Sequence, residues 1–536
     1  MKRITFVLSL LFASLLCRAE LNVKWGSPLP SNSAWKGETI NAVIEVSSSL
    51  PVKELTLKSG DLVCGTSVID ASRVGLNFIS LIAGEELLEQ YNQCGARDTV
   101  NYKAVYVPDM IDDRASVSLG TGQKQSVWMS INIPQNAVPG KYRGSLSFCE
   151  GEKVLAKLDY SVRVAGRVLP PLSESPFHLD LWQNPYAVAR FHNVPLWSEE
   201  HFKYMKPVMK MLSDAGQKVI TATIMDRPWN GQTEDPFGPM VTKIKRIDGS
   251  WLYDYTVFDK WVEFMMSLGI DGQINCYTLI PWALSFDYFD QATDQKVYIH
   301  AEPGSSLYEE YWGSFIKDFA AHLRSKGWFE KTYLAMDERS EESMKAALQL
   351  IRSVVPGFKV ALAGSYNESI ADEIDDLCIG FADGYPEGVV EARRAKGQIS
   401  TYYTCCAEKY PNTFIASNPL EASWLPLVSL SRNIDGYLRW AYNSWTENPK
   451  KDARFRTWAA GDCYIVYPGG ISSVRFERMK EGLQDYQKAS ILLEEYGRGS
   501  RKGAAIESAL RMFTKDELDL YGPERALNAL RKAMDR

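Results

Sequence analysis

Residues 332–338 read Thr-Tyr-Leu-Ala-Met-Asp-Glu, and this stretch indicates both the fold class and the position of the chemistry. Its apolar part has the length of a buried strand and runs directly into two acidic side chains, Asp337 and Glu338. Ser340 then offers a side-chain cap for a following helix. A strand that feeds a helix is the repeating unit of parallel α/β barrels, whose active sites lie at the carboxyl ends of the strands. The two carboxylates are therefore candidates for catalysis.

The alternation of short apolar strands and amphipathic helices extends in both directions from this stretch. The expected strands are Phe177–Trp182, Lys218–Ile224, Gln273–Ile280, Thr332–Met336, Lys359–Ala363, Ile379–Ala382, Ser400–Thr404 and Gly436–Ala441. Helices are expected between them at about 199–215, 257–268 and 308–324, and a last helix near 473–495 would close the ring. Eight such units predict a (β/α)8 barrel of the TIM type.

Residues 21–166 have a different pattern, in which short strands are separated by turn residues. Strands are expected at Thr39–Val46, Ser126–Ile133, Tyr142–Phe148 and Lys153–Val164, and this spacing predicts a β-sandwich. Prolines near residue 170 mark a linker. We expect a multidomain β plus α/β chain, with the sandwich at 20–166, the linker at 167–176, the catalytic barrel at 177–500 and a solvated helical tail at 501–536.

The chain begins with the pattern of an export signal. A basic start and a short apolar run, Ile4–Leu16, precede Ala19, which supplies the small residue before a cleavage site. The run is shorter than the ~20 residues that a membrane-spanning helix needs, and no later stretch is long enough. We expect residues 1–19 to be removed and the protein to be periplasmic or secreted. A lipid anchor at Cys17 is the alternative, which the large Leu16 disfavours.

The composition argues against several kinds of partner. The chain has 60 Lys and Arg against 66 Asp and Glu, with a formal net charge of −6 and no long basic run, so we expect no nucleic-acid partner. Its nine cysteines show no CxxC spacing, so we expect no metal and no cofactor. Cys64 and Cys94 could form a disulfide, whereas Cys405 and Cys406 are expected as buried thiols. The 15 Trp and 27 Tyr suit a carbohydrate site, although large cores use them too.

Adjacent carboxylates favour one glycosidase mechanism over the commoner one. Retaining glycosidases usually need two carboxyls ~5–5.5 Å apart on opposite sides of the sugar, which neighbouring residues rarely provide. In the other mechanism, the substrate's own 2-acetamido group attacks the anomeric carbon. Asp337 would then hold the acetamido N–H and stay ionised, while Glu338, with a raised pKa, would protonate the leaving oxygen and later deprotonate water. A competing interpretation is that both carboxylates only stabilise a helix N-terminus.

Further stretches form a recognisable series along the chain. They are Ile133–Gly144, Gly436–Trp445, Gly461–Asp462, Tyr467–Gly469 and Arg475–Tyr486. Together with the carboxylate pair, they resemble glycoside hydrolase family 123, the β-N-acetylgalactosaminidases, over essentially the whole mature chain. The resemblance implies a retaining, exo-acting enzyme for terminal β-linked N-acetylgalactosamine (GalNAc) that forms an oxazoline-type intermediate, with Asp337 orienting the acetamido group and Glu338 as general acid/base. Cys463 departs from the pattern and leaves the conformation of its loop open.

Aromatic and polar residues at strand ends are candidates for binding the sugar. Trp440 or Trp445 could form an apolar floor, and Asn443 could bind a hydroxyl, although alternation along a strand directs at least one Trp away from the site. Tyr385 or Tyr403 could position the acetamido carbonyl. The remaining candidates are Asp180, Trp182, Trp282 and Tyr467.

The expected partner is a glycan, either a GalNAc-terminated oligosaccharide or a glycolipid glycan. Two other functions stay open. A family 20-like β-N-acetylhexosaminidase also uses adjacent Asp and Glu on a barrel, but Gly436–Trp445 argues against it. A non-catalytic glycan-binding protein on a degenerate barrel is the other, and the intact pair of Asp337 and Glu338 argues against that.

Overall fold

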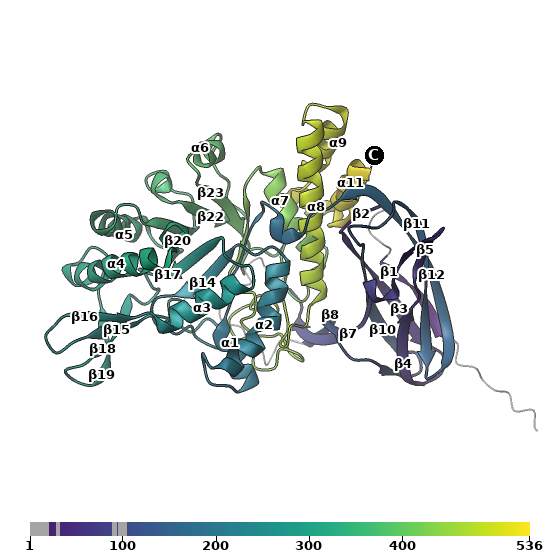
Figure 1. Cartoon of the computed structure of the whole chain (residues 1–536), viewed down its shortest axis with the longest axis horizontal. Helices are drawn as coiled ribbons and strands as arrows, with labels where there is room; N and C mark the ends of the chain where they lie inside the picture. Colours follow the sequence, from purple (N-terminus) through teal and green to yellow (C-terminus); the bar gives the residue numbers. More distant parts are fainter. Residues whose placement is uncertain (1–20, 28–32, 88–93, 95–103, 536) are drawn as a thin grey trace, which may run out of the picture.

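The computed structural model describes residues 21–27, 33–87, 94 and 104–535. A β-rich N-terminal region and a nearly closed parallel barrel lie on either side of the long helix α8, Val474–Tyr496 (Figure 1). The expected export segment 1–19, with Cys17, lies outside the described residues. Within the described part of the chain, no helix combines the length and the apolar character that a membrane crossing requires.

The N-terminal region contains two sheets whose buried side chains form one hydrophobic cluster. The first has the order β1-β3-β10-β7-β8, with bounds Leu21–Ser27, Thr39–Ser48, Lys124–Asn132, Val74–Glu85 and Ala104–Asp112. The second has the order β2-β12-β11-β4-β9, with bounds Ala34–Lys36, Lys153–Val168, Gly140–Glu150, Val52–Ser59 and Val117–Leu119. Two short strands, β5 (Leu62–Cys64) and β6 (Ser67–Ile69), extend the second sheet. The prediction of a β-rich N-terminal region is confirmed.

Strand β12 is longer than predicted and includes the start of the expected linker. Its residue Val168 pairs with Lys36 of β2, and the N–H of the next residue, Leu169, donates to the Lys36 carbonyl at 2.7 Å. Leu169 is buried. The chain therefore leaves the N-terminal region through a paired strand and a short 3₁₀ turn, Leu172–Glu174, rather than through an open linker.

Eight parallel strands form the barrel, in the order β13-β24-β23-β22-β21-β20-β17-β14. Their bounds are His178–Leu181, Gly436–Arg439, Ile399–Tyr403, Asp376–Gly380, Lys359–Gly364, Thr332–Asp337, Gln273–Tyr277 and Val219–Thr223. Each overlaps a predicted strand, and the sixth in the chain begins at Asp376 rather than Ile379. The runs of apolar and β-branched residues identified these strands because both faces of a parallel barrel strand are buried.

The barrel is nearly closed because β13 and β14 are joined only by an isolated bridge between Leu179 and Gln217. In the rest of the gap between β13 and β14, side-chain amides bind the backbone groups. The Gln217 Oε1 atom accepts a hydrogen bond from the Leu181 N–H at 3.0 Å. The Gln183 Oε1 atom accepts one from the Thr221 N–H at 2.9 Å. Two glutamines thus satisfy backbone groups that a regular ladder would pair.

Helices cover the outside of the barrel, but the alternation is incomplete. They are α1 (Pro185–His192), α2 (Glu199–Asp214), α3 (Thr256–Ser267), α4 (Ser306–Lys326), α5 (Glu341–Val354), α6 (Val389–Ala395), α7 (Glu421–Ser431) and α8. Between β21 and β22, the described chain has only the 3₁₀ turn Ala371–Glu373. The short segment 365–375 turns early because the Asn367 side chain accepts a hydrogen bond from the Ser369 N–H at 2.9 Å.

A second sheet, which the sequence did not predict, projects from one side of the barrel (Figure 1). It has the order β16-β15-β18-β19, with bounds Trp251–Asp254, Thr242–Lys245, Ser285–Asp290 and Gln295–His300. It packs on α4, where the Tyr311 hydroxyl donates to the Asp287 carbonyl at 2.7 Å. The strands come from the loops that follow β14 and β17.

Helix α8 joins the barrel to the N-terminal region through buried polar contacts. Arg475 binds both carboxylate oxygens of Asp109 at 3.0 Å, and Lys488 binds Glu38 at 3.0 Å. The partners of each pair are almost completely buried. Breaking such a pair leaves an uncompensated buried charge, so these contacts fix how the two regions are placed.

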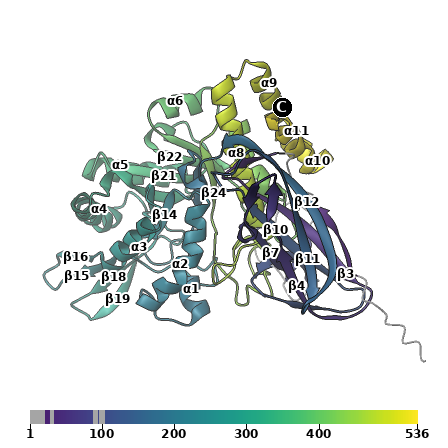
Figure 2. The same ribbon diagram turned by 45° about the vertical axis from the view of Figure 1, so that its right-hand side comes forward.

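The C-terminal segment is helical, as predicted, but it is not a solvated cap. Helices α9 (Arg501–Leu510) and α11 (Glu524–Asp535) lie beside α8, and α10 (Lys515–Tyr521) lies next to α11 (Figure 2). Their apolar residues Ile506, Leu527 and Leu530 belong to the large core cluster. The indole N–H of Trp424 in α7 donates to the Pro523 carbonyl at 2.9 Å. The apolar positions of these helices form one face, which packs on α7 and α8.

Candidate active site

A pocket opens at the carboxyl end of the barrel strands. Both predicted carboxylates, Asp337 at the end of β20 and Glu338 after it, line this pocket. Most other lining residues are aromatic or apolar; the rest of the wall consists of Trp182, Gln232, Trp282, Ala363, Tyr403, Cys405, Cys406, Leu438, Trp440 and Trp458. Paired acids within an aromatic pocket suit the binding and cleavage of a sugar.

Glu338 is held in an unusual backbone conformation at the rim. Its φ is 45°, a left-handed value that is uncommon for a residue with a side chain, and its N–H donates to the Ala363 carbonyl at 2.7 Å. The side chain is exposed. The Tyr403 hydroxyl donates to Glu338 Oε1 at 3.0 Å. Such strain occurs where neighbouring structure fixes a functional group, and here it turns the Glu338 side chain toward the pocket.

Asp337 lies deeper, and its environment favours the protonated form. Burial raises the pKa of Asp337 to about 7, and the nearby Glu338 carboxylate also raises it, while Arg339 and the indole N–H groups of Trp282 and Trp229 act in the opposite direction. The prediction that Asp337 stays ionised while Glu338 has the raised pKa is therefore wrong for Asp337. The pKa of Asp337 departs from the expectation because this carboxyl lies among aromatic rings that exclude water from it.

Aromatic rings form the floor beneath the carboxylates. Trp182 stacks on Trp229 with ring centroids 4.8 Å apart and lies 4.6 Å from the ring of Tyr277. The indole nitrogens of Trp182, Trp229 and Trp282 are buried, and the N–H groups of Trp229 and Trp282 face Asp337, whose ionised form they favour. These N–H groups therefore help to hold Asp337 in place beneath the pocket.

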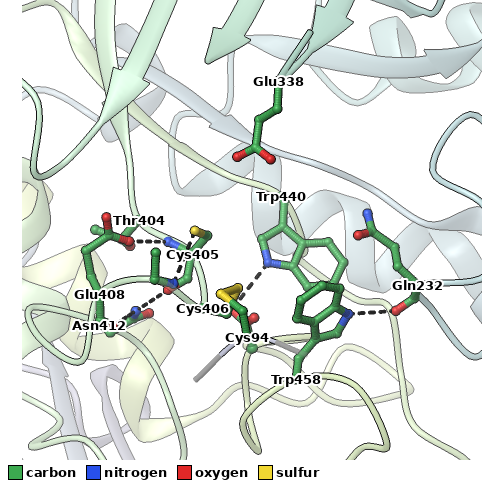
Figure 3. The surroundings of a disulfide bond; sticks show 12 residues. Cys94, Gln232, Glu338, Thr404, Cys405, Cys406, Glu408, Asn412, Trp440 and Trp458 are labelled. Atoms are coloured by element: carbon green, nitrogen blue, oxygen red, sulfur yellow. Dashed lines mark hydrogen bonds between the residues drawn. A yellow bond between two sulfur atoms is a disulfide. The ribbon is translucent and has the colours of Figure 1, made fainter. Parts of the chain in front are cut away.

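A second pair of tryptophans forms the opposite wall, where Figure 3 shows the Glu338 carboxylate pointing toward Trp440. The rings of Trp440 and Trp458 meet edge to face with centroids 5.8 Å apart. The Trp440 indole N–H donates to Asp462 Oδ1 at 3.3 Å, and the Trp458 N–H donates to the Gln232 carbonyl at 2.8 Å. Asp462 is held in turn by a fully buried ion pair of 2.7 Å with Arg439. These hydrogen bonds and the ion pair behind Asp462 therefore fix the positions of Trp440 and Trp458.

Five predicted binding residues lie elsewhere. Asn443 and Trp445 are fully buried. Asn443 exchanges hydrogen bonds with the Asn184 backbone, and the Trp445 N–H donates to the Val466 carbonyl. The Tyr467 hydroxyl donates to Asp109 at 2.6 Å, at the junction with the N-terminal region. The Tyr385 hydroxyl donates to the backbone carbonyls of Leu377 and Thr401. Asp180 faces the barrel interior, where Asn275 donates to it at 3.4 Å.

The other candidates reach the pocket, together with residues that the sequence did not single out. Trp182, Trp282, Tyr403 and Trp440 line it as predicted. Gln232, Leu438 and Trp458 line it too, and Trp229 lies below. Gln232, Trp229 and Trp458 belong to loops, where sequence periodicity gives no signal. The abundance of tryptophan was the only hint of them.

Cys405 is a free thiol, as expected, but the possible Cys64–Cys94 disulfide and the thiol expected at Cys406 are wrong. Cys94 is bonded to Cys406, 312 residues away in the chain, and Cys64 and Cys405 are free thiols. Cys64 lies at the end of β5, next to Gly140, within the N-terminal region, whereas Cys94 reaches the wall of the pocket beside Trp458. Nearness in sequence therefore did not correspond to nearness in space. Cys463, whose effect was left open, is buried, and its carbonyl accepts from the Ser444 N–H at 3.0 Å.

Comparison with known proteins identifies the class of this site. A model of the catalytic domain of glycoside hydrolase 123 matches residues 182–492, and a model of the N-terminal domain of glycoside hydrolase 123 matches residues 25–150. The barrel with its carboxylate pair is thus that of a glycosidase. The chain belongs to glycoside hydrolase family 123.

The chain is similar along nearly its whole length to one solved structure of this family. That structure is a family 123 glycoside hydrolase from Clostridium perfringens, studied for glycolipid glycan hydrolysis, with 29% identity, coverage of 96% of this chain and 98% of that one, and a TM-score of 0.86. A putative glycoside hydrolase from Bacteroides vulgatus has 12% identity, coverage of 87% and 79%, and a TM-score of 0.33, which is too low to support an inference. No curated protein matches the chain.

Proposed function

We propose that this protein is a retaining, exo-acting β-N-acetylgalactosaminidase that removes terminal β-GalNAc by substrate-assisted catalysis. The observation that carries the proposal is the adjacency of Asp337 and Glu338 in one aromatic pocket. The Glu338 carboxylate also raises the pKa of Asp337, so the two carboxyls lie near each other, which supports a mechanism whose nucleophile comes from the substrate. This is the arrangement that an internal acetamido nucleophile requires.

In the proposed first step, the acetamido oxygen attacks the anomeric carbon as the bond to the leaving oxygen breaks. Glu338 transfers its proton to that oxygen, and the Asp337 carboxylate accepts a hydrogen bond from the acetamido N–H and stabilises the positive charge that develops there. In the second step, Glu338 removes a proton from water, which opens the oxazoline-type intermediate at the anomeric carbon. Configuration is retained because the carbon is attacked twice.

The raised pKa of Asp337 fits this role. A half-buried carboxyl with a pKa of about 7 gains strongly from a ligand that brings an N–H donor and a developing positive charge, since both favour ionisation. Ionisation of Asp337 thus becomes most favourable as the acetamido oxygen attacks the anomeric carbon. An interaction that strengthens toward the transition state raises the rate of the chemical step.

The proposed substrate class is a GalNAc-terminated oligosaccharide or glycolipid glycan, in line with the glycolipid glycans hydrolysed by the C. perfringens relative. We also propose that the protein is exported, on the basis of the basic and apolar pattern of residues 1–19. A periplasmic or secreted enzyme would meet such glycans directly.

The test is product analysis with matched substrates. Nitrophenyl β-GalNAc should be cleaved faster than nitrophenyl β-GlcNAc, its epimer, and NMR should show the β-anomer of GalNAc as the first product. A thiazoline analogue of the cyclised intermediate should inhibit competitively. Preference for the GlcNAc substrate would favour a family 20-like specificity, and an initial α-anomer would contradict retention.

A further inference from the structure

The wall of the pocket opposite Asp337 is anchored on the N-terminal region. Cys406 lines the pocket and is bonded to Cys94, which lies between β7 and β8 in the sequence. Cys94 also forms an isolated antiparallel bridge with Trp458, another lining residue. The disulfide lies near Trp440 and Trp458 and below Glu338 in Figure 3.

The segment that carries Trp458 has a second anchor on the same region. At the end of β7, the Ala83 N–H donates to the Lys451 carbonyl at 2.9 Å, and the Ala83 carbonyl accepts from the Ala453 N–H at 2.8 Å. Glu85 accepts a hydrogen bond from the Ala460 N–H at 3.3 Å. The wall segment is thus attached to β7 on both sides of Trp458 and to Cys94 at Trp458 itself.

We propose that the Cys94–Cys406 disulfide is a positioning element of the glycosidase, through which the N-terminal region sets the sugar-binding wall formed by Trp440, Trp458 and Cys406. The three side chains meet at this bond because Cys406 follows β23 and Trp440 follows β24, a neighbouring barrel strand. The disulfide touches no reacting atom in this account. It acts by holding the two tryptophan rings at a fixed distance from Glu338.

The chemistry of the wall indicates what the disulfide controls. The indole N–H groups of Trp440 and Trp458 donate to Asp462 and to the Gln232 carbonyl. The two side chains therefore contact a ligand through the faces and edges of their rings. Ring surface binds the apolar face of a sugar equally in the ground state and in the transition state. If the wall becomes mobile, the substrate and the transition state are bound less tightly to the same extent. KM then rises while kcat stays nearly constant.

The experiment compares Cys94→Ser and Cys406→Ser with Cys64→Ser, which removes a free thiol from the same N-terminal region. The substrate is the nitrophenyl glycoside that the wild-type protein cleaves best from a panel of β-glycosides, so the outcome does not depend on which sugar is preferred. We expect both disulfide variants to raise KM by roughly tenfold and to change kcat by less than about twofold. Cys64→Ser should match the wild type, and Trp458→Ala should reproduce the rise in KM.

A disulfide that only stabilises the fold gives a different pattern. It would lower Tm in both variants and leave KM at the wild-type value when assayed well below Tm, and that result would overturn the proposal. If the serine variants do not fold, the same KM comparison is made on folded wild-type protein that has been reduced and alkylated. Alkylation of Cys94 and Cys406 without prior reduction, detected by peptide mass spectrometry, would also refute it.

Discussion

The hydroxyl of Tyr403, at the end of β23, donates a 3.0 Å hydrogen bond to Oε1 of Glu338, which follows β20. The two strands are separated by β21 and β22 in the barrel sheet, so this bond spans the mouth of the pocket. It links the proposed acid/base to the wall that carries Cys405 and Cys406.

Tyr403→Phe should lower kcat by about tenfold with little change in KM, because one hydrogen bond to a charged group contributes about 1.5 kcal/mol or more. Steady-state kinetics on a nitrophenyl glycoside would measure this. Tyr385→Phe is the matched control, since its hydroxyl binds backbone carbonyls away from the pocket. Equal kinetic effects of the two changes would show that the Tyr403 bond has no role in orienting Glu338.

The acid limb of the pH profile should report Asp337. With a pKa of about 7 in the free enzyme, the carboxyl gains its proton as pH falls below 7 and can no longer accept the acetamido N–H, so kcat/KM should decline there. The corresponding limb of kcat should lie at lower pH, because the bound substrate favours the ionised form. A kcat/KM value that stays constant from about pH 8 down to pH 5 would contradict this assignment.

Glu338→Ala should separate substrates by their leaving groups. The variant should lose at least about a hundredfold in kcat on a natural glycoside, which needs a proton on the departing oxygen. On a dinitrophenyl glycoside the loss should be much smaller, because that leaving group departs without a proton. Azide should partly restore turnover by replacing the activated water. A uniform loss across both substrates would argue that Glu338 is structural.

The ion pair behind Trp440 should matter for stability. Asp462→Ala leaves the fully buried Arg439 without its carboxylate partner and should cost about 3–5 kcal/mol of unfolding free energy. Chemical denaturation would measure the loss. Asp214→Ala, which breaks the exposed pair with Lys210, should cost less than about 1 kcal/mol. Similar values for the two variants would mean that the buried pair contributes little.

Much of the barrel could be predicted from the sequence because its strands are buried on both faces. The apolar run Tyr333–Met336 before Asp337 has the length of a buried strand. Ser340 marks the start of the next helix, where its hydroxyl accepts a hydrogen bond from the Ser343 N–H at 3.3 Å. The same local signals placed Asp337 and Glu338 in the pocket. They do not extend to the segment between β21 and β22, where a side-chain turn at Asn367 stands in place of the helix of a regular (β/α)8 unit.

The rest of the site depends on contacts that sequence spacing does not encode. Alternation predicted that at least one of Trp440 and Trp445 faces away from the site, but it did not say that Trp440 lines the pocket and that the Trp445 N–H binds the Val466 carbonyl. The pairing of Cys94 with Cys406 requires the N-terminal region to dock on the barrel. Neither periodicity nor composition predicts such docking, and the Asp337 pKa likewise depends on rings brought in from distant loops.

The central claim is that the substrate's own acetamido group is the nucleophile. The most direct measurement is the ratio of kcat/KM for nitrophenyl β-GalNAc to that for nitrophenyl β-galactoside, which has a hydroxyl in place of the acetamido group. The account predicts rapid cleavage of the first and no detectable cleavage of the second. Comparable cleavage of both glycosides would contradict it.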